Sequence, residues 1–255
     1  MTIPALHCQR IGAGPDLVLL HGWGLHAGIW APLVEALAPR FRLHLYDLPG
    51  HGRSAPVETF TLESVCEALA QDVPEQAYWL GWSLGGMVAL EFAARYPRRV
   101  SYLALLASNP KFVIGADWPH ALASEVLDGF AQDLSQDYVT TLQRFVSLVA
   151  RGAPDSGVLR MLRRALATAP APTQTALRGG LAILRDVDLR PRVRELHIPV
   201  LWLGGVRDTL VPITALRAVT TAYPRMQLRE IESAGHAPFV SHPQACAQAL
   251  TEFFV

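Results

Sequence analysis

Lysine is nearly absent from this chain of 255 residues, in which Lys111 is the only one. The other basic side chains are arginines, and 22 basic residues balance 22 acidic residues to a formal net charge of zero. A neutral chain lacks the excess positive charge with which proteins bind nucleic acids or acidic membranes. We therefore expect neither nucleic acid nor membrane as a partner.

Cysteine is also scarce. The chain has three cysteines, Cys8, Cys66 and Cys246, which are widely spaced and form no CxxC pair. This usage predicts neither a disulfide framework nor a thiolate metal site. No HExxH or similar histidine spacing indicates a metal either. We expect buried reduced thiols, no metal and no cofactor.

Long hydrophobic runs are missing as well. Residues 1–14 contain no apolar core long enough for a secretory signal, and the longest apolar runs, such as residues 102–107, are too short to cross a bilayer. We expect a cytoplasmic protein. The hydrophobic content of 51% is typical of a globular protein with a substantial core, and the length allows one large α/β domain or two small ones.

Apolar runs of strand length alternate with segments of helical spacing in two parts of the chain. Such alternation predicts an α/β protein with right-handed crossovers and a mostly parallel central sheet flanked by helices. The predicted strands are a short edge strand within residues 6–14, then 17–20, 43–48, 77–82, 100–107, 199–205 and 226–231. The predicted helices are 29–38, a helix through residue 69 with Thr61 (alternatively Ser64) as N-cap, 84–95, 212–222 and 243–253.

The alternation stops between residues 109 and 193, where several helical segments and no convincing strand are found. This interruption predicts a helical lid inserted between two strands of the sheet. We expect a core formed by residues 1–108 and 194–255, and a lid formed by residues 109–193.

A Gly-x-Ser-x-Gly motif joins the predicted strand 77–82 to the helix 84–95, with Ser83 at its centre. This layout is typical of a nucleophile elbow, a sharp turn with serine at its apex. A side chain at Gly81 or Gly85 would collide across the turn, and the serine must hold an unfavourable backbone angle. Gly86 would let the helix pack close to its neighbours. Ser83 is the predicted nucleophile.

A serine hydroxyl needs a base that removes its proton and an acid that orients the base. Asp208 follows the predicted strand 199–205, and His236 follows the strand 226–231. Parallel strands present both at the same sheet edge as Ser83, in the chain order Ser, Asp, His. Asp186 and Asp188 are alternatives for the acid. We interpret the histidines outside these motifs as structural or solvent-facing, namely His7, His26, His44, His120, His197 and His242.

An oxyanion hole requires two backbone N–H groups aimed at the developing negative charge. The residue after the nucleophile, Leu84, supplies one. The second is predicted from the loop after the strand 17–20, where the N–H of Trp23 is the best donor and its indole forms a wall of the pocket. The alternative is that Trp23 is only a core residue.

Several motifs together resemble the α/β-hydrolase superfamily, over essentially the whole chain. They are His21-Gly22-Trp23-Gly24, the run from Asp47 to Ser54, Gly81-Trp82-Ser83-Leu84-Gly85-Gly86 and Gly235-His236-Ala237-Pro238-Phe239. Within the superfamily, the first and third motifs resemble the BioH-type pimeloyl-acyl-carrier-protein methyl ester esterases of biotin synthesis. So do Val187-Asp188-Leu189-Arg190 and the run from Ala237 to Pro243.

This resemblance implies that Ser83 attacks the methyl ester of a pimeloyl chain carried on acyl carrier protein, that methanol leaves, and that water frees the acyl-enzyme. It also implies that the lid segment beginning at Arg144 lines the acyl channel. Ser147 is more polar than this role suggests. The implied substrate-binding residues are Trp23, Ser83, Leu84, Phe145, Val146, Ser147, Leu148, Val149 and His236.

Arginine is concentrated in the predicted lid. Between residues 140 and 180 the chain has six arginines and one acid, Asp155. Acyl carrier proteins are acidic, and complementary charge steers such encounters. We therefore expect docking of the carrier, through Arg144, Arg160, Arg163 and Arg164. The alternative is an ordinary solvated helix face.

Two other functions remain open at this level. One is a different small-molecule hydrolase of the same superfamily, such as a general esterase, a lactonase or a C–C bond hydrolase, because the lid and not the catalytic residues selects the substrate. The other is a ligand receptor on a hydrolase scaffold. In each case a monomer that acts on or binds small molecules is expected.

Overall fold

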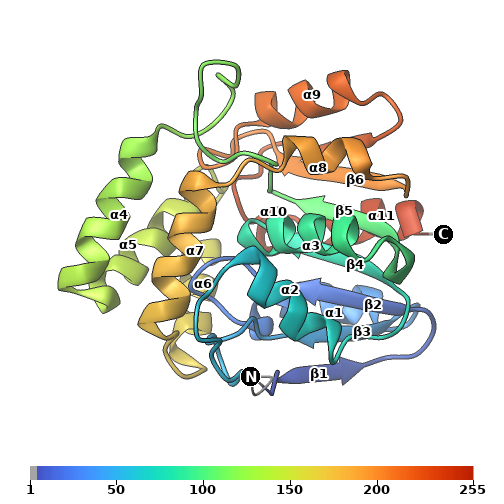
Figure 1. Cartoon of the computed structure of the whole chain (residues 1–255), viewed down its shortest axis with the longest axis horizontal. Coiled ribbons are helices and arrows are strands. Elements are labelled where there is room, and N and C mark those ends of the chain that lie inside the picture. Colours follow the sequence, from blue (N-terminus) through green and yellow to red (C-terminus); the bar gives the residue numbers. More distant parts are fainter. Residues whose placement is uncertain (1–4, 255) are drawn as a thin grey trace.

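A seven-stranded sheet lies at the centre of the protein, with the strand order β1-β3-β2-β4-β5-β6-β7 (Figure 1). The computed structural model describes residues 5–254, so residues 1–4 and 255, at the ends of the predicted core, lie outside it. Edge strand β1 runs antiparallel to β3, and all other neighbouring strands are parallel. The strands are β1 (Cys8–Ile11), β2 (Asp16–Leu20), β3 (Arg42–Tyr46), β4 (Ala77–Trp82), β5 (Val100–Leu106), β6 (Val200–Gly205) and β7 (Gln227–Ile231).

Helices cover both faces of this sheet. Right-handed crossovers place α1 on one face and α2 and α3 on the other, because the chain moves across the sheet in opposite directions through them. α11 packs on α1, and α8 packs on α3. These helices are α1 (Ala31–Leu37), α2 (Leu62–Ala70), α3 (Leu84–Arg95), α8 (Arg190–Glu195), α9 (Ile213–Ala222), α10 (Pro238–Ser241) and α11 (Pro243–Phe254).

Four further helices form the insertion between β5 and β6. They are α4 (Ser124–Gln136), α5 (Tyr138–Val149), α6 (Gly157–Ala167) and α7 (Gln174–Asp186). Figure 1 shows them gathered beyond the carboxyl tips of the strands. The prediction of a helical insertion is confirmed. Its predicted boundary between residues 193 and 194 falls inside α8, which packs on the core helix α3.

Most predicted elements are present within one or two residues of their expected ends, and β4 and α3 have the predicted bounds. The predicted helix 29–38 is wrong at its start: the chain forms a 3₁₀ turn, η1 (Ala27–Trp30), before α1. Pro32 explains the break, because it has no N–H to continue a helical ladder from η1 and suits the first turn of a new helix. The short α10 was not predicted.

Thr61 caps α2, as predicted. Its hydroxyl accepts from the N–H of Ser64 at 3.1 Å, and the hydroxyl of Ser64 accepts from the N–H of Thr61 at 3.0 Å. The two residues that the sequence offered as alternative caps therefore form one reciprocal capping box, which satisfies two donors at the helix terminus.

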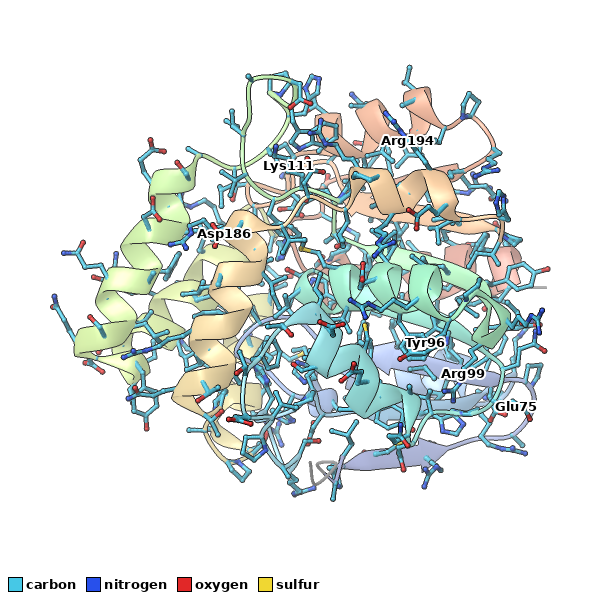
Figure 2. All side chains as sticks on the ribbon, in the orientation of Figure 1. Glu75, Tyr96, Arg99, Lys111, Asp186 and Arg194 are labelled. Atoms are coloured by element: carbon cyan, nitrogen blue, oxygen red, sulfur yellow. The ribbon has the colours of Figure 1, made fainter. Side chains whose placement is uncertain are left out.

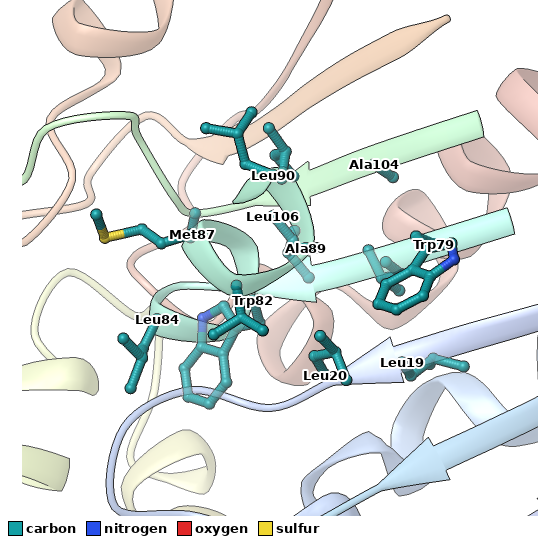
Figure 3. Close-up of a cluster of buried hydrophobic side chains, with 14 of the residues drawn as sticks. Leu19, Leu20, Trp79, Trp82, Leu84, Met87, Ala89, Leu90, Ala104 and Leu106 are labelled. Atoms are coloured by element: carbon teal, nitrogen blue, oxygen red, sulfur yellow. The ribbon is translucent and has the colours of Figure 1, made fainter. Parts of the chain in front are cut away.

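The core lies between the sheet and its helices. Figure 3 shows Leu19 and Leu20 of β2, Trp79 and Trp82 of β4 and the first turns of α3 packed together. Trp79 stacks on Phe92 with ring centroids 4.2 Å apart. Apart from Asp16 at the start of β2, the residues of β2 and β4 are apolar because helices cover both faces of these strands. None of the described helices is long and apolar enough to cross a membrane.

Two fully buried histidines lie beside the carboxyl edge of the sheet. The rings of His21 and His51 meet edge to face, with centroids 5.2 Å apart. Burial lowers the pKa of both imidazoles to about 3, and for His51 the neighbouring His21 adds to this effect. Nε2 of His21 accepts from the N–H of Leu48 at 2.9 Å. A protonated imidazole could not accept this hydrogen bond, so His21 is neutral in the folded chain.

These neutral histidines predict that weak acid destabilises the fold. The unfolded chain protonates them near pH 6.5, whereas the folded chain protonates them only near pH 3. Between these values the unfolded state binds more protons, so the free energy of unfolding falls as the pH falls, by up to about 1.4 kcal/mol per pH unit for each histidine. Chemical denaturation at a series of pH values measures this slope. His51→Gln should remove the contribution of one histidine from this slope. An unchanged slope would contradict a neutral, buried His51 in the folded chain.

Candidate active site

Ser83 lies at the turn between β4 and α3 with φ of +55° and ψ of −120°, a backbone conformation that residues with a side chain rarely adopt. Glycines make this turn possible. A methyl group at Gly81 would overlap the carbonyl of Gly85, and one at Gly85 would overlap the carbonyls of Leu20 and His21 at the end of β2. The predicted strand, sharp turn and helix are all present.

Gly86 brings α3 close to Ser108, which lies two residues after the end of β5. A methyl group there would lie 2.5 Å from the side chain of Ser108, as the predicted close packing requires. The hydroxyl of Ser108 donates to the carbonyl of Ser83 at 2.8 Å. Ser108 thereby holds the backbone of the residue at the apex of the turn.

Three predicted residues meet at the carboxyl edge of the sheet. Ser83 Oγ lies 3.0 Å from Nε2 of His236, and Nδ1 of His236 lies 2.8 Å from Oδ2 of Asp208. All three side chains are buried. A carboxylate on Nδ1 leaves Nε2 free to accept the serine proton, which is the arrangement that activates a hydroxyl nucleophile.

The loops around this chain of hydrogen bonds orient its members. Oδ1 of Asp208 accepts from the N–H groups of Leu210 at 2.8 Å and Val211 at 2.9 Å, which leaves Oδ2 for the histidine. The indole of Trp82 donates to the carbonyl of His236 at 2.8 Å. Trp82, which directly precedes Ser83, therefore also holds the backbone of His236.

The alternative acids lie elsewhere. Asp186 is paired with Arg185 at the end of α7, where Figure 2 places it on the lid surface. Asp188 is paired with Arg190 and Lys111. Of the three candidates, Asp208 is the one that contacts His236.

The two predicted oxyanion donors, Trp23 and Leu84, follow strands β2 and β4 at this same edge of the sheet. Within the described residues, neither Trp23 nor Leu84 donates its backbone N–H to a protein acceptor. Nδ1–H of His21 donates to the carbonyl of Gly22 at 2.8 Å. Because the peptide between Gly22 and Trp23 is trans, this bond directs the N–H of Trp23 the opposite way. Leu84 begins α3, so its N–H also carries the positive end of the helix dipole.

The side chain of Trp23 connects this loop to the lid. Its Nε1–H donates to the carbonyl of Leu177 in α7 at 2.8 Å. Its ring packs edge to face on that of Phe145 in α5, with ring centroids 4.8 Å apart. The indole is fully buried, so it serves both as a core residue and as the surface between the loop and the lid.

The predicted lid residues occupy different sides of α5. Phe145, Val146 and Val149 are buried, whereas Leu148 is half-buried and Ser147 is exposed, with its hydroxyl donating along the helix to Gln143. An α-helix turns by about 100° per residue, so five consecutive side chains cannot face one channel. Ser147 and Leu148 instead line a 580 Å³ cavity between α4 and α5, which the buried Phe130 of α4 also lines.

The predicted docking arginines are also placed differently from one another. Arg160, Arg163 and Arg164 are exposed on α6. Arg144 on α5 forms an ion pair with Asp133 of α4. Arg163 and Arg144 line the cavity between α4 and α5, where Arg151 joins them.

Three contacts in this site escaped the sequence interpretation. The positions of Trp82 and Ser108 in the sequence could have indicated them, because Trp82 ends β4 directly before Ser83 and Ser108 lies two residues after the neighbouring strand β5. Leu177 had no such signal, because it contributes a backbone carbonyl from a distant lid helix. Among the described residues, no cluster of three or more histidine, cysteine or acidic side chains is placed to hold a metal ion.

The strand order, the turn at Ser83 and the bonded serine, histidine and aspartate define a serine hydrolase on a parallel sheet. A family model described as alpha/beta hydrolase fold matches residues 15–243. The chain belongs to this α/β-hydrolase family.

Curated relatives resemble the chain over nearly its full length. It is 46% identical over 250 residues to the pimeloyl-acyl-carrier-protein methyl ester esterase of Xanthomonas campestris pv. campestris, covering 97% of this chain and 98% of that one. It is 41% identical to the protein of the same name from Vibrio vulnificus, covering 97% of each. An esterase structure from Exiguobacterium antarcticum shares the fold, with a TM-score of 0.88 at 21% identity over 98% of this chain and 95% of that one.

The role of Asp208 can be tested with Asp208→Asn. The amide oxygen can keep the two loop N–H bonds, which directs the NH₂ group at Nδ1 of His236. The imidazole must then carry its proton on Nε2, where it can no longer accept from Ser83. We expect kcat on an ester to fall by about 10⁴-fold with the fold retained.

Asp186→Asn is the matched control, because it makes the same chemical change on the lid surface. It should leave kcat unchanged. Comparable losses in the two variants, measured by steady-state hydrolysis of p-nitrophenyl acetate, would exclude Asp208 as the orienting acid.

Proposed function

We propose that this chain hydrolyses the methyl ester of pimeloyl-acyl carrier protein in biotin synthesis. The observation that carries the proposal is the hydrogen-bonded chain from Ser83 through His236 to Asp208. Relatives at 41–46% identity that bear the name of this esterase support the substrate.

In the proposed reaction, Ser83 Oγ attacks the ester carbonyl while His236 takes its proton. The negative charge that develops on the carbonyl oxygen is stabilised by the N–H groups of Leu84 and Trp23. Collapse of the intermediate expels methoxide, which leaves as methanol with the proton from His236. Water, activated by the same imidazole, then attacks the acyl-enzyme and frees the carboxylic acid and the serine.

We further propose that the acyl chain lies between the lid and the core. Phe145, Val146 and Val149 are the buried members of the predicted segment, and Phe145 contacts Trp23 beside the proposed oxyanion site. An apolar wall suits a hydrocarbon chain. Ser147 is exposed and lines the cavity between α4 and α5, so a contact from it would fall nearer the channel entrance than the scissile bond.

The carrier itself is proposed to dock on the arginine-rich side of the lid. Arg160, Arg163 and Arg164 have no ion-pair partner within the described chain, so their charge is available to an acidic partner. Arg144, already paired with Asp133, is the weakest of the four candidates.

We propose that the enzyme works as a cytoplasmic monomer. One chain supplies the nucleophile, the base, the acid and both proposed oxyanion donors. The three cysteines are free thiols, and burial raises the pKa of Cys66 and Cys246, which suits a reducing compartment.

The function is tested with the purified protein and pimeloyl-acyl carrier protein methyl ester. We expect release of equal amounts of methanol and the free acid, detected by gas chromatography and by the mass of the carrier. Ser83→Ala should release neither, since it lacks the attacking oxygen. The gene should also rescue biotin-requiring cells that lack their own methyl esterase. Hydrolysis of small esters without any action on the carrier-bound ester would favour a general esterase instead.

The docking surface is tested by the double variant Arg160→Glu with Arg164→Glu. Reversed charge repels an acidic carrier, so kcat/KM for the carrier-bound ester should fall by roughly tenfold or more at low salt, while that for p-nitrophenyl acetate stays unchanged. The control is Arg98→Glu with Arg229→Glu, which makes the same net change at exposed arginines on the core. Equal losses on both substrates would count against docking at α6.

A further inference from the structure

The loop between α5 and α6 touches the core by its backbone. Gly152 in this loop has φ of +82°, and a methyl group there would overlap the carbonyl oxygen of Arg207. Arg207 directly precedes Asp208. The lid backbone therefore lies against the loop that carries the proposed acid, with no room for a side chain between them.

The same lid loop lies against the segment that carries the histidine. A methyl group at Gly235, which directly precedes His236, would lie 2.5 Å from the carbonyl oxygen of Arg151 and 3.2 Å from the nitrogen of Ala153. The N–H of Arg207 donates to the carbonyl of Ala234 at 2.8 Å. The backbones of three loops are thus stacked on one another: the loop before Asp208, the loop before His236 and the lid loop 151–153.

Other parts of the lid hold the loop after β2. Trp23 is bonded to Leu177 of α7, and Nε2 of His26 lies 2.8 Å from the carbonyl of Ala165 at the end of α6. The lid therefore contacts the loops of the acid, the base and one proposed oxyanion donor. A simple cover over the acyl chain would not need these contacts.

We propose that the loop Arg151-Gly152-Ala153 is a positioning element of the active site, which sets the spacing of Asp208 and His236 when the lid is seated. Closure of the lid then assembles the hydrogen-bonded chain as well as enclosing the substrate. The inference rests on the proposed esterase function.

The two roles of the lid predict opposite results on a small ester. If the lid only covers the site, loosening it improves access and raises the turnover of p-nitrophenyl acetate. If the loop positions the acid and the base, the same change lowers kcat, because a displacement of about 1 Å in a catalytic group can cost 10²-fold. The KM for so small a substrate should change little.

The test uses Gly152→Ala, Gly152→Asn and Gly235→Ala in the full chain. Each adds a Cβ atom at the stack, and asparagine tolerates a positive φ better than alanine, so a loss in both Gly152 variants reports the contact and not the backbone angle. We expect kcat for p-nitrophenyl acetate to fall tenfold to a hundredfold, with KM within about twofold of the native value.

Gly129→Ala is the control, since a methyl group at this lid glycine meets no atom within 4 Å. It should retain native kcat. Ala153→Gly loosens the loop without adding an atom, and a severalfold lower kcat in this variant supports the proposal even if the bulkier variants do not fold. Circular dichroism and thermal denaturation identify the folded variants.

Native or raised kcat in folded Gly152 and Gly235 variants would overturn the positioning role while leaving the esterase function intact. Absence of turnover by the native protein would overturn the proposed function, and this inference with it.

Discussion

The backbone conformation of Ser83 is the constraint on which the site depends. A residue with positive φ between a strand and a helix is unfavourable, and it persists only where the surroundings hold it. Here Gly81 and Gly85 let the turn close against the end of β2, and Ser108 holds the carbonyl of Ser83. The consequence is a hydroxyl that projects beyond the sheet edge toward His236.

The parallel sheet supplies the partners of this hydroxyl. Because β4, β6 and β7 end at one edge, residues separated by more than a hundred positions come within hydrogen-bond distance of one another. Burial then excludes water from the bonds between Ser83, His236 and Asp208, which strengthens them. The fold thus brings residues that are far apart in the chain into hydrogen-bond contact, and the proposed chemistry depends on that contact.

The lid adds two separate properties. Its inner side contributes buried apolar residues of α5 and the carbonyl that holds Trp23, while its outer side carries the exposed arginines of α6. In the proposed function, the reaction class depends on the sheet edge, whereas the choice of ester depends on the lid. The contacts of the lid loop with Arg207 and Gly235 connect the lid to the sheet edge physically.

Elements whose signals are local follow from the amino-acid sequence alone. The glycines around Ser83 predicted β4, the sharp turn and α3 with their bounds, and the positions of Asp208 and His236 after strands predicted their meeting. The Thr61 cap was predicted for the same reason, since capping involves neighbours in the chain.

The buried side of α5 depends on how the chain folds, since helical periodicity indicates a face but not the partner that covers it. This is why Ser147 and Phe145 were grouped together in sequence and lie on different sides of the lid. The bond from Trp23 to Leu177 joins residues 154 positions apart through a backbone carbonyl, which every residue has. Because no residue type indicates such a contact, it cannot be predicted from the sequence and is seen only in the folded chain.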